Sequence, residues 1–422
     1  MIHRRMTAKN YLRVVVVVAA AGSQFGLLAA LDTNQIEQLT GLKGKWNAEE
    51  SVFKVTSPRA DVKVTVEQWP MPPFMGLTSW AAFKSGLKEN VMVMGDLVLF
   101  QDEANPVMSV LFENGVEVTA LHNHFFFDHP KVYFMHIGGE GTLTQLAGGV
   151  KAALAKVKEI RSQNSQPAET FGRALPATSS ISAEPLQQLF TAKPEVKDGM
   201  VKFVFGRVTK MPCGCEAGKE MGVNTWAAFA GQDDNAVVDG DFACQEQELQ
   251  PVLRSLRKSE VNVVAIHQHM TQEQPRYVFL HYWGRGKAAD LANAVRLARG
   301  EQTKATAAVA RDAGGFQEVD AAHFNKHRSD GALVLDVRSP EEFAKGHVPG
   351  ALNVDINAPG FASKVSTFDK SKPILLNCHA GSRGAIASAE LAKLGFKTVC
   401  NLEGGLAAWE KAGNRPETSP QK

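Results

Sequence analysis

The 422-residue sequence predicts an α/β domain at the C-terminus, preceded by two tandem copies of an α+β unit. Three observations predict this fold class. A chain of this length exceeds what one hydrophobic core usually organises. A set of residues recurs at matched spacing in the N-terminal two thirds of the chain. An apolar strand near residue 378 then leads through a short loop into a helix.

The composition is that of an ordinary globular protein. Hydrophobic residues make up 44% of the chain and charged residues 21%. The formal net charge is +2, which gives no electrostatic basis for binding nucleic acid or a membrane surface. We therefore expect small molecules, and no nucleic acid, as partners.

Residues 1–30 have the pattern of a secretory signal peptide. Four basic residues precede the apolar run Val14–Ala21, and the first acidic residue is Asp32. The apolar run is short for a membrane span, so an uncleaved anchor is the second interpretation. We expect a periplasmic or secreted protein with no stable membrane insertion after the signal is cleaved.

The chain has five cysteines, and none lies before Cys213. No cysteine therefore follows the signal segment to carry a lipid anchor. An exported protein can form disulfides, but the count is odd. Cys213, Cys215 and Cys244 could form a disulfide bridge or a thiolate site. The favoured interpretation is that they are ordinary cysteines, either reduced or locally bridged.

An internal repeat organises the N-terminal region. Asp96 lies 26 positions before His122, and the same 26 positions separate Asp241 from His267. A further 14 positions lead from His122 to His136 and from His267 to His281. Chance does not preserve two spacings together with the residue types, so we expect a duplicated domain.

Each copy predicts the same order of elements. The expected elements in the two copies are a strand over Val91–Phe100 or Ala236–Cys244, a helix from about Glu103 or Glu246, a strand over Val116–His124 or Val261–His269, a strand over Lys131–His136 or Arg276–His281, and a helix over Leu143–Val157 or Ala288–Ala298. This β-α-β-β-α order is typical of a ferredoxin-like α+β sandwich. Two such repeats predict a pseudo-dimer whose sheets face each other across a cleft.

The candidate site residues of the repeats are His122, His124, His136, His267, His269 and His281. Alternate residues of a strand face the same side, so each His-x-His pair should project together, and the partner strand would add the third histidine. Three imidazoles can bind a transition metal such as zinc, copper or iron. The alternatives are a polar cleft without metal and hydrogen-bonded core histidines. Asp96 and Asp241 are candidate supporting or general-base carboxylates.

Two segments have the composition of linkers. One is rich in Ser, Gln, Pro and Ala, and the other is Ala/Thr-rich and ends in Gly-Gly, which indicates a helix tail and a flexible tether. The expected segments are a signal peptide at 1–30, repeats at 31–155 and 184–300, linkers at 156–183 and 301–315, and the α/β domain at 316–415.

Cys378 lies between an apolar strand and a helix. Pro373–Asn377 has strand character, and apolar residues at helical spacing follow Arg383. Such a loop aims backbone N–H groups and the positive end of the helix dipole at the sulfur, which favours the thiolate. An anion near the sulfur would be held by the loop amides and by Arg383. We predict a nucleophilic cysteine rather than a buried structural one.

Residues 316–415 resemble a single rhodanese domain. Leu335–Val354 is similar to the first signature of that family, Asn401–Trp409 to the closing one, and Cys378-x4-Arg383 to the active loop. The resemblance implies a three-layer α/β fold and a persulfide on Cys378. It also implies that the sulfur donor is held by the loop residues His379, Ala380, Gly381, Ser382 and Arg383. Asp336 and Arg338 would brace this loop.

Two details of this loop bear on the substrate. Four residues between the cysteine and the arginine suit a sulfane sulfur, whereas phosphatase-like relatives have five and accommodate a phosphate or arsenate. His379 stands where many sulfurtransferases have arginine, so a fixed charge is replaced by a titratable one.

Residues 31–300 resemble the LppY/LpqO family. Pro106-Val-Met, Glu117–His124 and Met135-His136 carry this resemblance. It implies an exported, duplicated domain of unknown function and no particular reaction. A cupin barrel is not favoured, because helices separate the strands.

The sequence as a whole predicts an exported sulfurtransferase. Sulfur would pass from a thiosulfate-like donor, through Cys378, to a thiol or cyanide acceptor, with no cofactor required. One alternative is a periplasmic ligand- or metal-binding protein whose rhodanese domain is a sensor or partner module. A metal-dependent enzyme in the repeats is the other.

Overall fold

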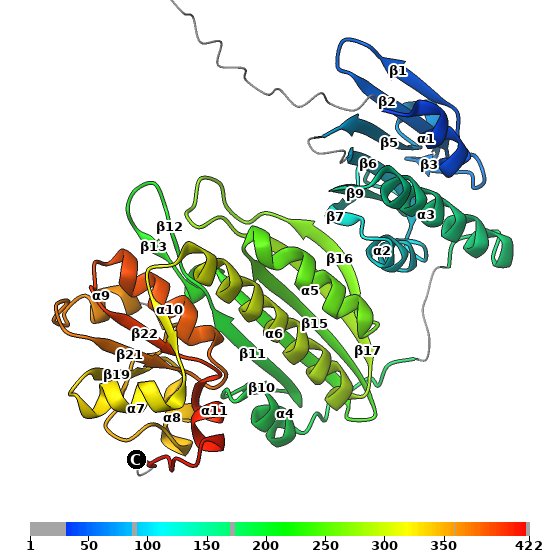
Figure 1. Ribbon diagram of the computed structural model, residues 1–422. Helices are drawn as coiled ribbons and strands as arrows, with labels where there is room; N and C mark the ends of the chain where they lie inside the picture. Colours follow the sequence, from blue (N-terminus) through cyan, green and yellow to red (C-terminus); the bar gives the residue numbers. More distant parts are fainter. Residues whose placement is uncertain (1–30, 87–90, 169–173, 359, 419–422) are drawn as a thin grey trace, which may run out of the picture.

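The computed structural model describes residues 31–86, 91–168, 174–358 and 360–418 (Figure 1). Two bodies make up this part of the chain. A 12-stranded sheet is built from both repeats, and a separate five-stranded sheet forms the C-terminal domain. The predicted signal peptide, residues 1–30, lies outside the described residues. Among the helices of the described residues, none combines the length and apolar character that crossing a membrane requires.

The first repeat is a mostly antiparallel unit with three helices. Its elements are α1 (Thr33–Thr40), β1 (Gly44–Asn47), β2 (Val52–Pro58), β3 (Thr65–Val66), β4 (Trp69–Pro70), β5 (Thr78–Ser85), β6 (Val91–Phe100), α2 (Ala104–Glu113), β7 (Glu117–His122), β8 (Asp128–His129), β9 (Val132–Gly141) and α3 (Leu143–Gln163). Strand β9 pairs antiparallel with both β6 and β7, so α2 connects two parallel strands that are separated by a third.

The second repeat follows the same plan. Its elements are α4 (Ala183–Phe190), β10 (Glu195–Lys197), β11 (Met200–Gly206), β12 (Thr209–Lys210), β13 (Glu216–Ala217), β14 (Asn224–Gln232), β15 (Asn235–Cys244), α5 (Glu246–Lys258), β16 (Asn262–His267), β17 (Val278–Gly286) and α6 (Ala288–Ala313). Helix α5 begins at a capping box of Gln245 and Glu248 and ends with Arg257 and Lys258, which suits the helix dipole at both ends.

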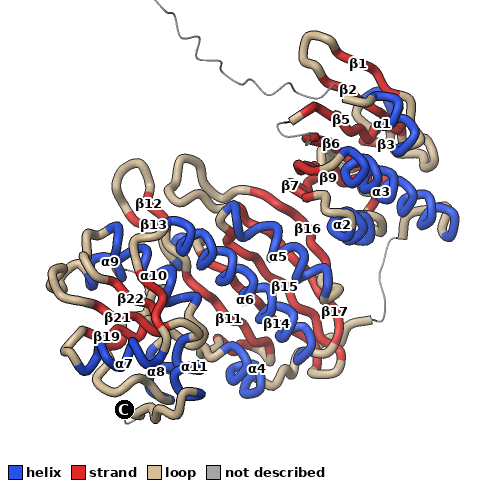
Figure 2. The backbone as a smooth tube through the Cα atoms, viewed as in Figure 1, coloured by secondary structure: helices blue, strands red, loops and turns tan. Residues whose placement is uncertain are grey.

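The two repeats join edge to edge, so the prediction of two sheets facing each other across a cleft is wrong. Strands β7 and β16 pair antiparallel, with Leu121 opposite Ile266. Helix side chains strengthen this edge: the Asn105 amide exchanges hydrogen bonds of 2.8 and 3.0 Å with the Val263 backbone. The two edge strands satisfy each other's backbone groups, which explains why the sheets merge rather than stack (Figure 2).

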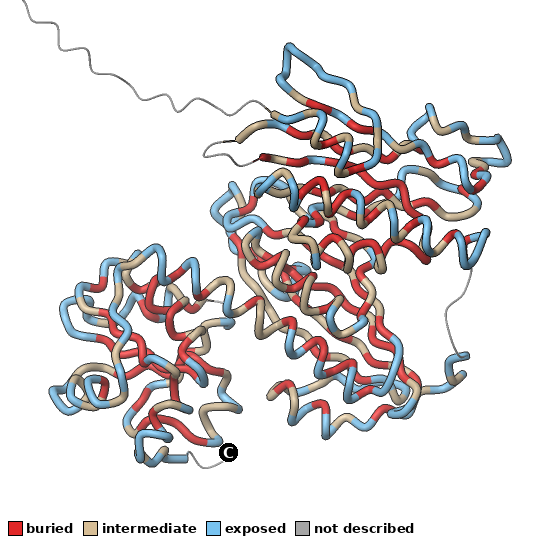
Figure 3. The backbone as a smooth tube through the Cα atoms, turned by 45° about the vertical axis from the view of Figure 1, so that its right-hand side comes forward, coloured by how far each residue is buried: buried red, intermediate tan, exposed pale blue. Residues whose placement is uncertain are grey.

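Helices cover one face of this sheet, and the histidines lie on the other face, parts of which carry two smaller hydrophobic clusters. Leu280 and Tyr282 of β17 belong to the main hydrophobic core, together with residues of α5 and α6. His281 lies between them and therefore points to the opposite face. Figure 3 shows the buried backbone concentrated in the strands and in the inner sides of the helices.

The C-terminal domain is a three-layer α/β fold. Its elements are β18 (Gln317–Val319), α7 (Ala321–Ser329), β19 (Leu333–Asp336), α8 (Pro340–Lys345), β20 (Leu352–Asn353), α9 (Phe361–Val365), β21 (Ile374–Asn377), α10 (Ser382–Lys393), β22 (Val399–Leu402) and α11 (Gly405–Lys411). All strand pairs are parallel, in the order β18-β22-β21-β19-β20. Leu376 and Leu375 of β21 belong to separate hydrophobic clusters, one on each side of the sheet.

Helix α6 continues through most of the segment expected to be a helix tail and a flexible tether. It runs to Ala313 and packs against α10. Gln302 is buried within it and donates a 2.8 Å hydrogen bond to the Ala243 carbonyl. Residues 301–313 are therefore helical because their side chains bind the second repeat, and the helix places that repeat against the helix that follows Cys378.

Candidate functional site

The Cys378 sulfur lies directly beyond the end of β21, at the start of α10. The side chain is 1% exposed. The Gly381 backbone N–H donates to Sγ over 3.1 Å, and Gly381 has a φ of +86°, a conformation that favours glycine. The strand and helix thus hold the sulfur against a backbone donor at a positive helix end.

Residues of the closing signature, Asn401–Trp409, support the backbone of the cysteine loop. Leu406 N–H donates to the Cys378 carbonyl over 2.7 Å. A Cβ at Gly405 would lie 2.4 Å from the same carbonyl oxygen, so a larger residue cannot occupy this position without moving the loop. Asn401 Nδ2 donates to the Gly381 carbonyl over 3.0 Å. These contacts fix the backbone that carries the sulfur.

Arg383 is engaged by an acidic partner that the sequence did not reveal. Its Nη1 and Nη2 atoms donate to the Glu342 carboxylate over 2.6 and 2.8 Å. Burial acts to raise the pKa of Glu342, but the hydrogen bonds and charge of Arg383 outweigh it and lower that pKa. The arginine expected to help hold the donor anion is therefore also paired with Glu342.

Asp336 and Arg338 brace the end of β21, the strand that precedes Cys378. The Asp336 carboxylate is buried and accepts from Arg338 Nη2 over 2.6 Å. It also accepts from the side-chain amide of Asn377 over 3.2 Å, and Asn377 is the residue before Cys378. Among the described residues, the hydrogen bonds of this pair reach Asn377 and not Cys378, so the pair acts through Asn377.

The remaining loop residues form the accessible part of the site. His379 and Ala380 are exposed, and Ser382 is half-buried. The loop backbone thus reaches solvent while the sulfur behind it is enclosed. A small anion would meet His379 and Ala380 first.

The second repeat borders this site through α6. The Arg299 guanidinium carbon lies 3.3 Å from the centre of the Phe205 ring. Burial, followed by the charge of Arg383, lowers the pKa of Arg299 to about 10. Arg299 therefore lies close enough to the Arg383–Glu342 pair to sense both charges.

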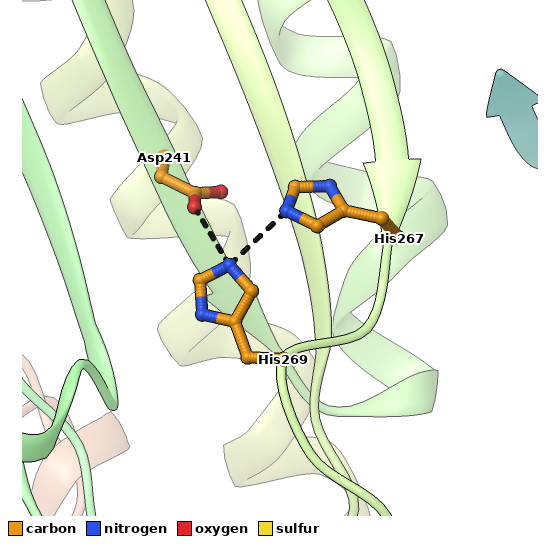
Figure 4. A group of neighbouring side chains, drawn as sticks. All are labelled: Asp241, His267 and His269. Atoms are coloured by element: carbon orange, nitrogen blue, oxygen red, sulfur yellow. Dashed lines mark hydrogen bonds and ion pairs between the residues drawn. The ribbon is translucent and has the colours of Figure 1, made fainter. Parts of the chain in front are cut away.

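The histidines of the second repeat come together with an aspartate. His267 Nε2 and His269 Nε2 are 3.1 Å apart, and His269 Nε2 is 3.5 Å from Asp241 Oδ2 (Figure 4). One ligand atom from each of these three residues lies within 4.8 Å of the other two. His281 instead contacts Asp239 Oδ1 over 3.1 Å, so it does not complete the predicted three-histidine group.

Burial shapes the protonation of this group. Burial raises the pKa of Asp241 to about 7, and the charge of Asp239 adds to the effect. Burial also lowers the pKa of His267 and of His269, and the neighbouring imidazoles lower both further. The rings are therefore held neutral, which is the form that binds metals.

The His-x-His pairs are not held together by strand alternation. Strands β7 and β16 end at His122 and His267, so the second histidine of each pair lies in the following turn. His269 instead stacks on Phe279, with ring centres 3.5 Å apart. His124 stacks on Phe134 in the same way, at 3.4 Å. Aromatic stacking therefore orients the second ring of each pair.

The first repeat brings its three predicted histidines together, about as closely as His267 and His269, whose ring centres are 5.0 Å apart. The His122 ring centre lies 5.1 Å from those of His124 and His136. Asp96 is buried and lies opposite His136 in the pairing of β6 with β9. Met94 is 57% exposed and occupies the position that Asp239 holds in the second repeat, so the two copies differ in donor set.

A polar cleft of about 300 Å³ adjoins the second cluster. Gly222 links the two features, because its backbone hydrogen-bonds the His269 ring and it also lines the cleft. The other lining residues are Glu195, Lys202, Val204, Lys219, Glu220 and Asn224. Gly222 is thus the residue that the cleft and the surroundings of His269 have in common.

All five cysteines are free thiols in the structure. Cys213 and Cys215 are exposed between β12 and β13, and Cys244 is buried. The Cys215 N–H donates to Cys213 Sγ over 3.4 Å. The bridge considered among these three residues is therefore not formed.

Comparisons with known proteins divide the chain in the same way. A family model described as Domain of Unknown Function (DUF1259) matches residues 34–156 and 184–300, which is more than half of the chain. A model of the rhodanese-like domain matches residues 320–412. Neither description carries the LppY/LpqO name, which stays a prediction.

Curated relatives resemble the C-terminal domain alone. Thiosulfate sulfurtransferase GlpE of Ectopseudomonas mendocina is 32% identical over 94 residues, covering 22% of this chain and 84% of the relative. Thiosulfate sulfurtransferase 16, chloroplastic, of Arabidopsis thaliana is 39% identical over 93 residues, covering 20% and 78%. Protein HIGH ARSENIC CONTENT 1, mitochondrial, of the same plant is 38% identical over 103 residues, covering 22% of this chain and 61% of that protein. The chain therefore belongs to the DUF1259 family and carries a rhodanese-like domain at its C-terminus.

Proposed function

We propose that the C-terminal domain is a sulfurtransferase that carries sulfane sulfur as a persulfide on Cys378. The observation that carries the proposal is the position of Sγ, which accepts the Gly381 N–H at the start of α10. A backbone donor and a positive helix end both favour the thiolate over the thiol. The similarity to thiosulfate sulfurtransferases over most of their length supports the same chemistry.

The first half-reaction loads the cysteine. The Cys378 thiolate attacks the outer sulfur of thiosulfate, a bond forms between Sγ and that sulfur, and the sulfur–sulfur bond of thiosulfate breaks. Sulfite leaves with the bonding electron pair. Loop amides near the exposed backbone of His379 and Ala380 would stabilise the charge of the departing anion.

The second half-reaction unloads the cysteine. A thiolate or cyanide attacks the terminal sulfur of the persulfide, and Cys378 leaves as a thiolate. Both steps are nucleophilic displacements at sulfur, so the scheme uses no cofactor. The partners in this scheme are a small sulfur donor and a small nucleophilic acceptor.

In this scheme Arg383 provides a partly neutralised positive charge at a fixed position at the end of the loop. Glu342 neutralises much of its charge, and the bidentate geometry fixes the guanidinium at the end of the loop. We therefore assign Glu342 as a positioning residue that acts through Arg383. Asp336 and Arg338 support the loop from the other side through Asn377.

The test is the formation of thiocyanate from thiosulfate and cyanide by the full chain. Wild-type protein should form thiocyanate, and Cys378→Ser should abolish it, because a serine hydroxyl is not ionised at neutral pH. Cys213→Ser is the matched control, since Cys213 is an exposed thiol outside the loop, and it should keep wild-type activity. Full activity in Cys378→Ser would disprove the proposal.

A further inference from the structure

We propose that Asp241, His267 and His269 form a binding site for one divalent transition metal ion of the zinc class. The site lies on the face of the second repeat opposite to the helices. It is independent of the sulfur chemistry proposed for Cys378. Two imidazoles and one carboxylate are the donor types that zinc and its neighbours prefer.

The spacing of the donor atoms fits a single ion. Nitrogen and oxygen ligands bind zinc at roughly 2.0–2.2 Å, so tetrahedral ligands lie about 3.4 Å from each other. The two Nε2 atoms are 3.1 Å apart, and the Nε2–Oδ2 distance is 3.5 Å. Two of the three donor distances therefore match those of ligands to one ion, and the third donor atom lies within 4.8 Å of both others.

The aspartate supplies a second, independent observation. Asp241 is 4% exposed, and its Oδ1 atom has no hydrogen-bond partner among the described residues. A buried polar atom without a partner is costly, and native structures contain few of them. A metal ion between Asp241 and the imidazoles would stabilise this buried carboxylate.

Surrounding contacts hold the His269 ring in place for binding. The ring stacks on Phe279, and the Gly222 backbone hydrogen-bonds it. Such outer contacts orient the histidine ligands of metal sites and select the tautomer. Three protein ligands leave at least one coordination position, which is typical of catalytic rather than structural zinc.

The first repeat does not present the same group. The His122 ring centre lies 5.1 Å from those of His124 and His136, so the rings are as close as in the second repeat, and the difference lies in the donor atoms. In the described part of the chain, the group of donor atoms within 4.8 Å of one another is that of the second repeat. The duplicated copy therefore provides an internal control with the same residue types.

The experiment is a calorimetric titration of the chelator-stripped full chain with Zn²⁺. We expect one tight site per chain. Asp241→Asn, which keeps the side-chain volume, and the double variant His267→Ala/His269→Ala should each weaken binding by at least about 100-fold, since even outer contacts of metal ligands are worth 10–100-fold. The matched control, His122→Ala/His124→Ala, should retain the site.

Two further measurements test whether the variants fold and which ligands the site provides. Circular dichroism should show the wild-type spectrum for each variant. Titration of the wild-type protein with Co²⁺ should produce visible absorption bands of a low-symmetry site with nitrogen ligands. Absence of Zn²⁺ binding and Co²⁺ bands in the wild type would overturn the proposal, and so would equal loss of binding in the first-repeat control. Neither result would affect the sulfur transfer proposed for Cys378.

Discussion

Glu342 holds Arg383 through two parallel hydrogen bonds of 2.6 and 2.8 Å, so the arginine of the cysteine loop is paired before any donor arrives. The two residues come from α8 and α10, on different segments of the rhodanese-like domain. The pair therefore joins the first signature to the active loop. Its strength decides how rigidly the end of the loop is held.

Glu342→Gln should destabilise the C-terminal domain by about 1–3 kcal/mol, because a partly buried arginine loses its charged partner. Urea unfolding measures this change. Glu341→Gln is the matched control, because Glu341 is the exposed neighbour on the same helix, and its effect should stay within about 0.5 kcal/mol. Equal stability of the two variants would refute the role given to the pair.

The same pair predicts a pH dependence of stability. The pKa of Glu342 is lowered from its ordinary value of 4.5 in the folded protein, so the unfolded chain binds a proton first as the pH falls. The contribution of Glu342 to stability is present above about pH 4.5 and is lost as the pH falls through the lower, folded pKa. The difference in unfolding free energy between wild type and Glu342→Gln should therefore shrink below pH 4.5. A difference that grows there would contradict this assignment.

Arg299→Ala should raise the KM for thiosulfate about threefold with little change in kcat, because it removes a positive charge beside the active loop. Steady-state kinetics over a range of donor concentrations measures the change. Arg296→Ala removes an exposed charge from the same helix and serves as the control. If both variants behave like wild type, α6 contributes no electrostatic effect to the site.

We propose that the protein is exported, on the basis of the basic and apolar pattern in residues 1–30. N-terminal sequencing of the mature protein should find a start between about Gly22 and Asp32. The protein should be recovered from an exported fraction. A cytosolic protein that keeps Met1–Arg5 would exclude this proposal.

Local patterns predicted most of the strands and helices. The expected strand Val91–Phe100 coincides with β6, because ten residues of nearly continuous apolar character are typical of a strand buried inside a sheet. The order of elements in the second repeat was predicted from the first in the same way. The loop around Cys378 was predicted because a strand, a glycine turn and a helix follow each other within a few residues.

Contacts between distant segments could not be predicted from the same patterns. The pairing of β7 with β16 depends on which edges remain free after each repeat folds. The partnership of Glu342 with Arg383 spans 41 positions, and many acidic residues could have supplied it. In the second cluster, His281 contacts Asp239, and Asp241 takes the third place beside His267 and His269. These contacts depend on side-chain conformations, which residue spacing does not predict.

The most direct test of sulfur transfer is the intact mass of the protein after incubation with thiosulfate and removal of the excess. The account predicts a mass gain of one sulfur atom, located by peptide mapping on Cys378 and lost after addition of cyanide. Cys378→Ser should show no such gain, and Cys213→Ser should show it in full. Sulfur found on another cysteine, with Cys378 unmodified in an active preparation, would contradict the central claim.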